Sequence, residues 1–193
     1  IQIANWLDFQ PEPGYQFFKP SSDTRDAGVI KSRFGGREYP CTLIDPQHSE
    51  GIIEKMQNNC RVVLIDEVEL FGNGIEETIE KLLLRNLSVA AAGLDLDFRG
   101  ELFGAREELY VMSRLLGMAD SVYKRPGSCD YDVNGKRCGS KSTRTQRLIN
   151  GEPAPYNSPL IMIDRVAEGV TYQSRCLRHH DVPGKPTAPG TNP

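Results

Sequence analysis

Hydrophobic and polar positions follow two alternating spacings from residue 16 to residue 124. Short apolar runs have the length and composition of buried strands, while longer segments carry apolar side chains at the i, i+3, i+4 spacing of helices. The expected strands are 16–19, 61–66, 88–92 and 121–124. The expected helices are 50–57, 74–85 and 104–116. Strands that alternate with helices predict an α/β fold with a parallel sheet.

The pattern changes near Arg125, after which cysteine, glycine and basic residues replace the apolar runs. Asn134-Gly135 predicts a hairpin over 131–136, whereas the prolines and Asn150-Gly151 within 143–159 predict a loop. The proline-rich end has too few apolar side chains to fold by burial, so we expect it to be disordered. The sequence therefore predicts an α/β domain, a small cysteine-containing subdomain and a disordered tail, over 1–125, 126–180 and 181–193.

The composition narrows the class of protein and of ligand. The chain has 193 residues, of which 38% are hydrophobic and 25% charged, as is typical of a globular protein. A net charge of -3 leaves no basic footprint for a nucleic acid, and no apolar run reaches the roughly 20 residues that span a bilayer. The odd number of cysteines, five, argues against a disulfide scaffold and for a reducing compartment. We expect a cytoplasmic protein with a small ligand and with neither a nucleic-acid nor a membrane partner.

Two segments carry acidic side chains in a pattern that indicates chemistry. The apolar run 62–65 ends in the paired carboxylates Asp66 and Glu67, and a second acidic segment, Gly-Leu-Asp-Leu-Asp-Phe-Arg-Gly, occupies 93–100. Enzymes that act on nucleotide phosphates use strand-end acids in this way, to place a magnesium-linked group and a catalytic base. Taken alone, the first segment is equally typical of a strand that ends at solvent.

These segments occur in order with 18–25, Cys138-Gly139 and 143–148. Together they resemble the thymidine kinase family of the bacterial, human-cytosolic and poxvirus type. The resemblance implies a P-loop-NTPase-like parallel sheet flanked by helices, and a small zinc-binding subdomain that carries a lasso-like substrate loop. It also implies an ATP-dependent kinase for thymidine, with deoxyuridine as a second candidate substrate, that serves nucleotide salvage for DNA synthesis as a homotetramer.

The resemblance assigns roles to the strand-end acids. Glu67 matches the catalytic base, and Asp66 matches the acid that supports magnesium, through water. Asp23 and Arg25 match an element near the phosphates, although a turn residue with its salt-bridge partner would look the same. Glu69 belongs to this nucleotide and magnesium group and stands where the family usually has Gln. The added negative charge should either repel the donor or recruit a cation.

A second set of residues matches the walls of the family's nucleoside pocket. Flat apolar side chains suit a pyrimidine ring. The expected substrate-binding residues are Leu94, Phe98, Arg99, Phe103, Ile161, Ile163 and Tyr172. Arg99 is expected to stabilise charge, and 161–163 is expected to form an apolar strand beside the loop that reads the base. Asp164-Arg165 replaces the family's Gly-Gly, which affects the expected selectivity for thymidine.

Cysteine and histidine spacing in the second part predicts a structural zinc site. Zinc ions in such sites are held tetrahedrally by four Cys or His side chains. The expected ligands are Cys129, Cys138, Cys176 and His179. The last two form a C-x-x-H pair, whereas the first two are separated by eight residues instead of the family's two. His180 is an alternative ligand, and unligated thiols in a loop-rich subdomain are the alternative to a metal.

One hallmark of the family does not occur in this sequence. The family begins with a strand and a glycine-rich loop that ends in Gly-Lys-Ser or Gly-Lys-Thr and binds phosphates. The sequence opens with Ile1-Gln2-Ile3-Ala4, which resembles the end of the helix after that loop, and Gly139-Ser140-Lys141-Ser142 lacks the required preceding glycine and strand. We expect a truncated or partly unobserved product. The alternatives are a non-catalytic nucleoside-binding relative that lost the loop and, third, a zinc-binding interaction module.

Overall fold

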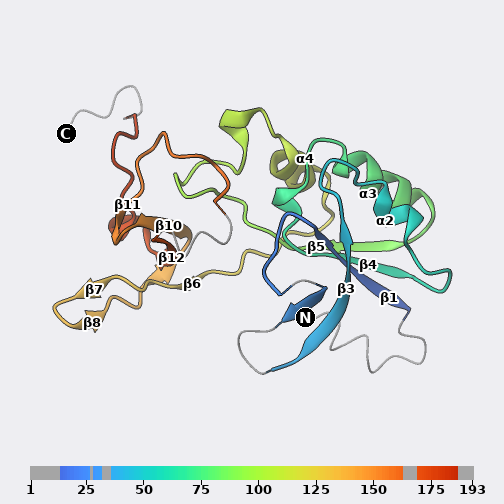
Figure 1. Cartoon of the computed structure of the whole chain (residues 1–193), viewed down its shortest axis with the longest axis horizontal. Helices are drawn as coiled ribbons and strands as arrows, with labels where there is room; N and C mark the ends of the chain where they lie inside the picture. The colour runs from blue at the N-terminus through green and yellow to red at the C-terminus, as the bar shows by residue number, and fades with distance from the viewer. Residues whose placement is uncertain (1–13, 27, 32–35, 163–168, 187–193) are drawn as a thin grey trace. The chain divides into compact units, whose positions relative to one another are not determined.

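The computed structural model of the chain describes residues 14–26, 28–31, 36–162 and 169–186. These residues form two compact units (Figure 1). The first unit contains residues 1–95 and 108–118, and the second contains residues 96–107 and 119–193. Residues 96–107, which the sequence analysis assigned to the α/β domain, are therefore grouped with the cysteine-containing part. Within the described residues, no helix combines the length and the apolar composition needed to span a membrane.

A five-stranded sheet organises the first unit, with the strand order β2-β3-β1-β4-β5. Its parallel strands are β1 (Tyr15–Pro20), β3 (Glu38–Ile44), β4 (Val62–Ile65) and β5 (Ser88–Ala91). The edge strand β2 (Val29–Lys31) pairs antiparallel with β3. The parallel sheet that the alternating pattern predicted is therefore present.

Three helices lie on one side of this sheet, as Figure 1 shows. They are α2 (Gly51–Glu54), α3 (Ile75–Leu84) and α4 (Val111–Met118). Alternate strand residues point to opposite faces, so Phe18, Val63 and Ile65 are completely or almost completely buried together, whereas Phe17 and Leu64 pack with Tyr39 in a separate cluster. Because both faces of β1 and β4 are buried, these strands hold the residues at their carboxyl ends firmly in place.

Two of the sequence-based expectations for the first part are wrong. The expected helix over 104–116 is interrupted, because Gly104 and Glu108 have positive φ angles of 76° and 56°. Only a short 3-10 turn, η2 (Ala105–Glu107), precedes α4. The expected strand at 121–124 has no strand partner among the described residues, and Tyr123 is 78% exposed.

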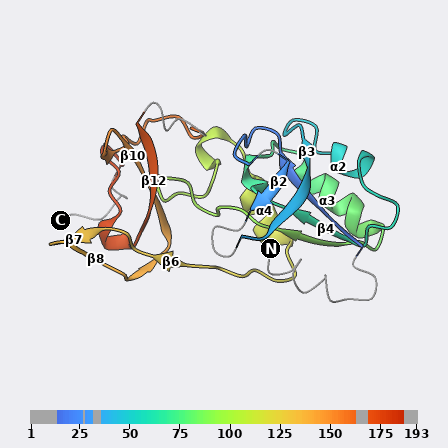
Figure 2. The same cartoon turned by 60° about the horizontal axis from the view of Figure 1, so that its bottom comes forward.

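The second unit is built from short antiparallel strands. Its three-stranded sheet has the order β11-β10-β12, from β11 (Glu152–Pro153), β10 (Arg144–Ile149) and β12 (Val170–Arg175). Figure 2 shows β10 and β12 side by side. Two smaller pairs are β6 (Gly127–Ser128) with β9 (Lys141–Ser142), and β7 (Asp132–Val133) with β8 (Lys136–Arg137). The β7–β8 pair confirms the hairpin expected at Asn134-Gly135, whose φ angles are 55° and 80°.

The expected loop over 143–159 is wrong, because β10 and β11 form a hairpin there. Asn150 and Gly151, with φ angles of 52° and 86°, make its two-residue turn. The sequence hid the strand because Gln146 and Arg147, each 2% exposed, occupy buried positions that are usually apolar.

Two further expectations for the second part need correction. Ile161 and Met162 are not in a strand, and Ile163 lies outside the described residues. The tail is ordered over 181–186: Asp181 N–H donates to Gln146 Oε1 at 2.8 Å, and Pro183 O accepts from the N–H of Tyr156 at 2.9 Å. Residues 187–193 lie outside the described part of the chain.

Candidate active site

Two carboxylates leave the carboxyl end of β4 in a fixed geometry. The Asp66 N–H donates to Phe18 O at 2.9 Å, which continues the ladder between β4 and β1. Glu67 then adopts the left-handed conformation, with φ 51° and ψ 43°. This conformation is unfavourable for residues other than glycine and is concentrated at functional sites. It directs Glu67 toward Arg25, and the two side chains form an ion pair of 3.1 Å between Oε1 and the guanidinium.

The end of β1 and the turn after it add two cations and a third acid. Asp23 is 3% exposed and accepts from Arg25 Nε at 2.7 Å and from Lys19 Nζ at 3.1 Å. Lys19 is also 3% exposed and donates to the Arg25 carbonyl. Asp23 thus fixes both cations, and Arg25 bridges it to Glu67. Sequence reasoning gave Lys19 no role, although a lysine within an apolar strand is itself a signal, because a buried cation needs a partner.

These side chains line a small cleft at the strand ends of the first unit. Its volume is about 110 Å³, and its charged lining consists of Lys19, Asp23, Arg25, Asp26, Lys31, Asp66 and Glu67. The structure therefore brings together four of the residues that the sequence analysis assigned to catalysis and to nucleotide or magnesium binding: Asp23, Arg25, Asp66 and Glu67.

Burial and mutual repulsion shift the proton affinities of the strand-end acids. Burial is the main cause that raises the pKa of Asp66. Burial also raises the pKa of Glu67, the charges of Asp66 and Asp23 add to this rise, and Arg25 opposes it. A carboxylate with a raised pKa is a stronger base, and a general base works best when its pKa approaches the working pH. A divalent cation beside these acids would relieve their repulsion, so the cluster fits the magnesium site that the sequence analysis expected.

Glu69 differs from the other acids because it is enclosed. The residue is 3% exposed, and its Oε2 has no hydrogen-bond partner among the described residues. Burial and the charge of Glu67 raise the pKa of Glu69 to about 8, so it is mostly protonated at neutral pH. Gly93 makes room for it, since a Cβ at this position would lie 2.2 Å from Glu69 Oε2. A side chain at the first glycine of the 93–100 segment would therefore displace the Glu69 carboxylate.

The same segment forms a tight turn at the start of the second unit. Asp97 Oδ1 accepts from the N–H of Arg99 at 2.8 Å, and the Gly100 N–H donates to Asp97 O at 3.0 Å. Gly100 has a φ of 70°, and a Cβ there would lie 3.1 Å from Arg144 Nε and 3.2 Å from His180 Cε1. Positive φ and close packing both require glycine at this position.

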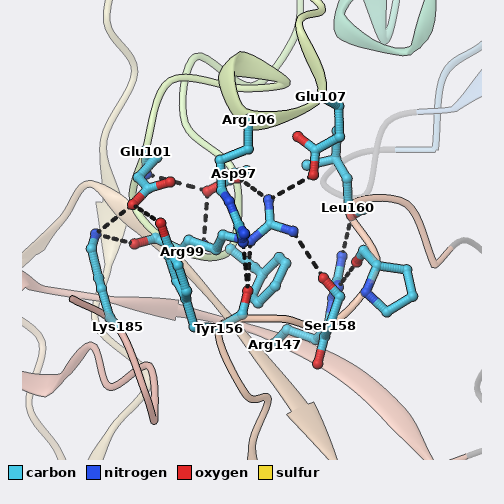
Figure 3. Close-up of polar contacts among 12 residues, drawn as sticks. Asp97, Arg99, Glu101, Arg106, Glu107, Arg147, Tyr156, Ser158, Leu160 and Lys185 are labelled. Atoms are coloured by element: carbon cyan, nitrogen blue, oxygen red, sulfur yellow. Dashed lines mark hydrogen bonds and ion pairs between the residues drawn. The ribbon is translucent and has the colours of Figure 1, made fainter.

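Arg99 is buried and fully engaged in this turn. Its guanidinium pairs with Asp97 at 2.8 Å and with Glu107 at 3.2 Å, and the residue is 2% exposed. It also donates to the carbonyls of Tyr156 and Ser158, at 2.9 and 2.8 Å (Figure 3). These contacts indicate a role in holding the chain at 156–158, whereas the sequence analysis expected Arg99 to stabilise charge at the reacting group.

The expected pocket residues differ in exposure. Phe98 and Phe103 are 3% and 9% exposed. The half-exposed members are Leu94, Ile161 and Tyr172. Leu94 belongs to the first unit, whereas Phe98, Phe103, Ile161 and Tyr172 belong to the second. Within the second unit, Phe98 and Tyr172 are linked by Arg147, which stacks 3.9 Å from the Phe98 ring centre and donates to the Tyr172 hydroxyl at 3.0 Å.

Four side chains of the second unit form a candidate metal centre. The ligand atoms of Cys129, Cys138, Cys176 and His179 all lie within 4.8 Å of one another. His179 Nδ1 is 3.7 Å from the Cys129 sulfur and 3.5 Å from the Cys176 sulfur, and the imidazole stacks on Tyr131 with a centroid distance of 4.3 Å. Hydrogen bonds with Ser140 lower the pKa of Cys138 to about 6, which favours the thiolate that binds metal. Three thiols and one imidazole fit a tetrahedral ion, and zinc is the ion that this donor set favours.

His180, the alternative ligand, lies outside this cluster. Its Nε2 is 2.9 Å from the carbonyl oxygen of Phe98, to which it donates. Burial lowers the pKa of His180, and the hydrogen bond to the Phe98 carbonyl opposes this shift only in part. His179 therefore lies in the candidate metal centre, and His180 bonds to the turn at Phe98.

Most of the chain is similar to proteins of one family. The family model described as thymidine kinase matches residues 12–180. A thymidine kinase of Coprothermobacter proteolyticus is 40% identical over 168 residues, which cover 86% of this chain and 75% of that protein. A thymidine kinase of Mycoplasmoides gallisepticum is 36% identical over 172 residues, with 88% and 68% covered. A thymidine kinase of Pyrobaculum aerophilum is 38% identical over 168 residues, with 86% and 82% covered.

Proposed function

Because the chain belongs to the thymidine kinase family, we propose that it transfers the γ-phosphate of ATP to the 5′-hydroxyl of thymidine. The observation that carries this proposal is the position of Glu67, which is held in the left-handed conformation at the end of β4, 3.1 Å from Arg25. A strained carboxylate with a raised pKa, lining a cleft, suits a general base.

The proposed reaction follows from the groups around the cleft. Glu67 accepts the proton of the 5′-hydroxyl while the oxygen forms a bond to the γ-phosphorus, and the bond between that phosphorus and the β-γ bridging oxygen breaks to release ADP. Arg25 is placed to stabilise the negative charge that develops on the transferred group. Asp23 holds Arg25 through its Nε, which keeps the guanidinium directed at the site.

Two metals complete the proposal. Asp66 would hold magnesium through water, and magnesium bound with ATP would offset the charge of the phosphates. Zinc at Cys129, Cys138, Cys176 and His179 would stabilise the second unit, in which these residues come from separate short elements. Both assignments are supported by the donor groups present in the two units.

Several properties remain predictions that stem from the family resemblance. They are a homotetrameric assembly, a cytoplasmic location, a role in nucleotide salvage for DNA synthesis, and deoxyuridine as a second substrate. The non-catalytic alternative has no better support, since the residues expected for proton transfer and charge stabilisation are present and adjacent.

The test is ATP-dependent phosphorylation of thymidine by the full-length, zinc-loaded protein, with Glu67→Gln as the variant. Loss of the base should lower kcat by about 10²–10⁴-fold, while thymidine binding measured by calorimetry is retained. Glu80→Gln, on the exposed face of α3, is the matched control and should leave kcat unchanged. A wild-type protein that binds thymidine and transfers no phosphate would support the non-catalytic alternative instead.

A further inference from the structure

Arg147 is a buried cation in the second unit that the proposed chemistry does not use. The residue lies in β10 and is 2% exposed. None of its hydrogen-bond acceptors among the described residues is a carboxylate: they are one phenol oxygen and two backbone carbonyls. Burial lowers the pKa of Arg147, which shows that its surroundings oppose the charge. A buried charge without an ion-pair partner is costly, so its value to the protein must lie in the contacts that it makes.

The guanidinium of Arg147 joins three separate parts of the second unit. Its Nε donates to the Tyr172 hydroxyl on β12 at 3.0 Å, and its two terminal nitrogens donate to the carbonyls of Pro159 and Leu160. Its plane also lies over the ring of Phe98, with 3.9 Å between the guanidinium carbon and the ring centre. Only the planar fork of an arginine can serve all of these contacts at once.

The carbonyls held by Arg147 belong to a stretch of chain that Arg99 holds as well. Arg99 donates to the carbonyls of Tyr156 and Ser158, so two guanidiniums together bind four carbonyls between 156 and 160 (Figure 3). The stretch is held again at residue 162, whose carbonyl accepts from the Tyr172 hydroxyl at 3.1 Å. Tyr172 is therefore fixed on one side by Arg147 and on the other by the chain that Arg147 itself positions.

We propose that Arg147 is a positioning residue that sets the affinity for thymidine, by holding Phe98, Tyr172 and the backbone at 159–160 in one arrangement. The inference rests on the proposed function, and on the expectation from the family resemblance that Phe98 and Tyr172 contact the nucleoside. Arg147 itself does not contact the substrate. All of its guanidinium nitrogens bond to groups that line the expected pocket, and the positions of these groups relative to one another depend on Arg147.

Arg147→Lys is the direct test, because lysine keeps the charge and loses the fork. Its single ammonium can reach only part of the set formed by Tyr172, Pro159 and Leu160, and it cannot stack flat on Phe98. We expect the KM for thymidine to rise about tenfold or more, given the usual strength of hydrogen bonds to charged donors. The KM for ATP and kcat at saturating thymidine should stay within about twofold, since the pocket is misplaced and the reacting groups are not.

Arg175→Lys is the matched control. Arg175 is also buried, in the neighbouring strand β12 directly opposite Arg144, and its guanidinium bonds to Ser174 and Gln173, outside the loop. Tyr172→Phe is the second variant, because it removes the hydroxyl between Arg147 and residue 162. If both variants disturb one arrangement, the double variant should raise the KM by clearly less than the product of the two single effects. Zinc content and the thermal midpoint are measured for every variant.

Three results would overturn the proposal. They are an unchanged KM for thymidine in Arg147→Lys, an equal rise of the KM for ATP, and an equal effect of Arg175→Lys. Failure of the proposed function looks different, because the wild-type protein would then phosphorylate no nucleoside at all. In that case the same variants are compared by calorimetric binding of thymidine, and an affinity that Arg147→Lys leaves unchanged overturns the proposal.

Discussion

Replacement of Glu69 by glutamine should make the protein more stable, by an amount that increases with pH. The pKa of Glu69 is about 8 in the folded chain, against an ordinary value of 4.5, and burial is the largest cause. Between these pH values the folded chain keeps the proton and the unfolded chain releases it. The free energy of unfolding therefore falls by about 1.4 kcal/mol for each pH unit of that interval. Glutamine has nearly the same shape and does not titrate, so the variant escapes this loss.

The magnitude follows from the interval chosen for the measurement. From pH 5.5 to pH 7.0, the difference in unfolding free energy between Glu69→Gln and the wild type should grow by about 2 kcal/mol. For a chain of this size, the corresponding growth in the difference between melting temperatures is about 4–8 °C. Above a pH of about 8 both states of the wild type are ionised, so the difference should stop growing there.

The assay is urea and thermal unfolding of both proteins at several pH values, without nucleotide or magnesium, so that ligands do not change the charge of the cluster. Glu80→Gln, on the exposed face of α3, serves as the control and should follow the wild type at every pH. The reasoning is refuted if Glu69→Gln and the wild type differ by the same amount at pH 5.5 and pH 7.0. That result would mean that Glu69 ionises in the folded protein as readily as in the unfolded chain.

Two further predictions concern the metal centre and the cation pair beside the cleft. Elemental analysis should find one zinc ion per chain in the wild type and in His180→Ala, and none in His179→Ala. The reason is that His179 lies beside the three thiols, whereas His180 bonds to the Phe98 carbonyl. Zinc retained by His179→Ala would contradict the assigned ligands. Asp23→Asn should cost about 3–5 kcal/mol in urea unfolding at pH 7, because it leaves buried Lys19 without its anion. Burial opposes ionisation of Asp23, but hydrogen bonds from Arg25 and Lys19 lower its pKa overall, so its contribution is present above the ordinary carboxyl pKa and is lost as pH falls. A variant as stable as the wild type at pH 7 would show that the pair contributes nothing.

Periodicity predicted three of the five strands of the first unit, the apolar runs of β1, β4 and β5, and it missed β2 and β3. The runs that contain Val63 and Phe18 can only be buried strands, and the positions of β1, β4 and β5 follow from them. The wrong helix over 104–116 has a local cause, since Glu108 takes a positive φ that no sequence pattern marks at a glutamate. The wrong strand at 121–124 has a different cause, because extended sequence becomes a strand only where a partner offers hydrogen bonds.

The second unit was less predictable because polar side chains occupy its interior. Gln146 and Arg147 stand in the middle of β10 and are as buried as the apolar core, so an apolar pattern could not mark that strand. Gln146 also bonds to both the N–H and the carbonyl of Asp181, and so orders the start of the tail that was expected to be disordered. Of the site residues, the acids were proposed from the family resemblance and the metal ligands from the spacing of Cys and His. Lys19 left only the signal of a lysine within an apolar strand, and Arg147 is recognisable only from what it contacts.

Buried polar groups explain why the sequence pattern missed β10, and they also occur where we place function. A buried polar or charged side chain destabilises the protein unless its contacts offset the loss of hydration, so we expect it to serve geometry that an apolar side chain cannot provide. Lys19 fixes Asp23 beside the cleft, and Arg147 fixes the loop at 159–160. Glu69 is the exception, since its Oε2 has no partner among the described residues. That contrast is why its replacement should stabilise the protein, whereas replacement of Asp23 should do the opposite.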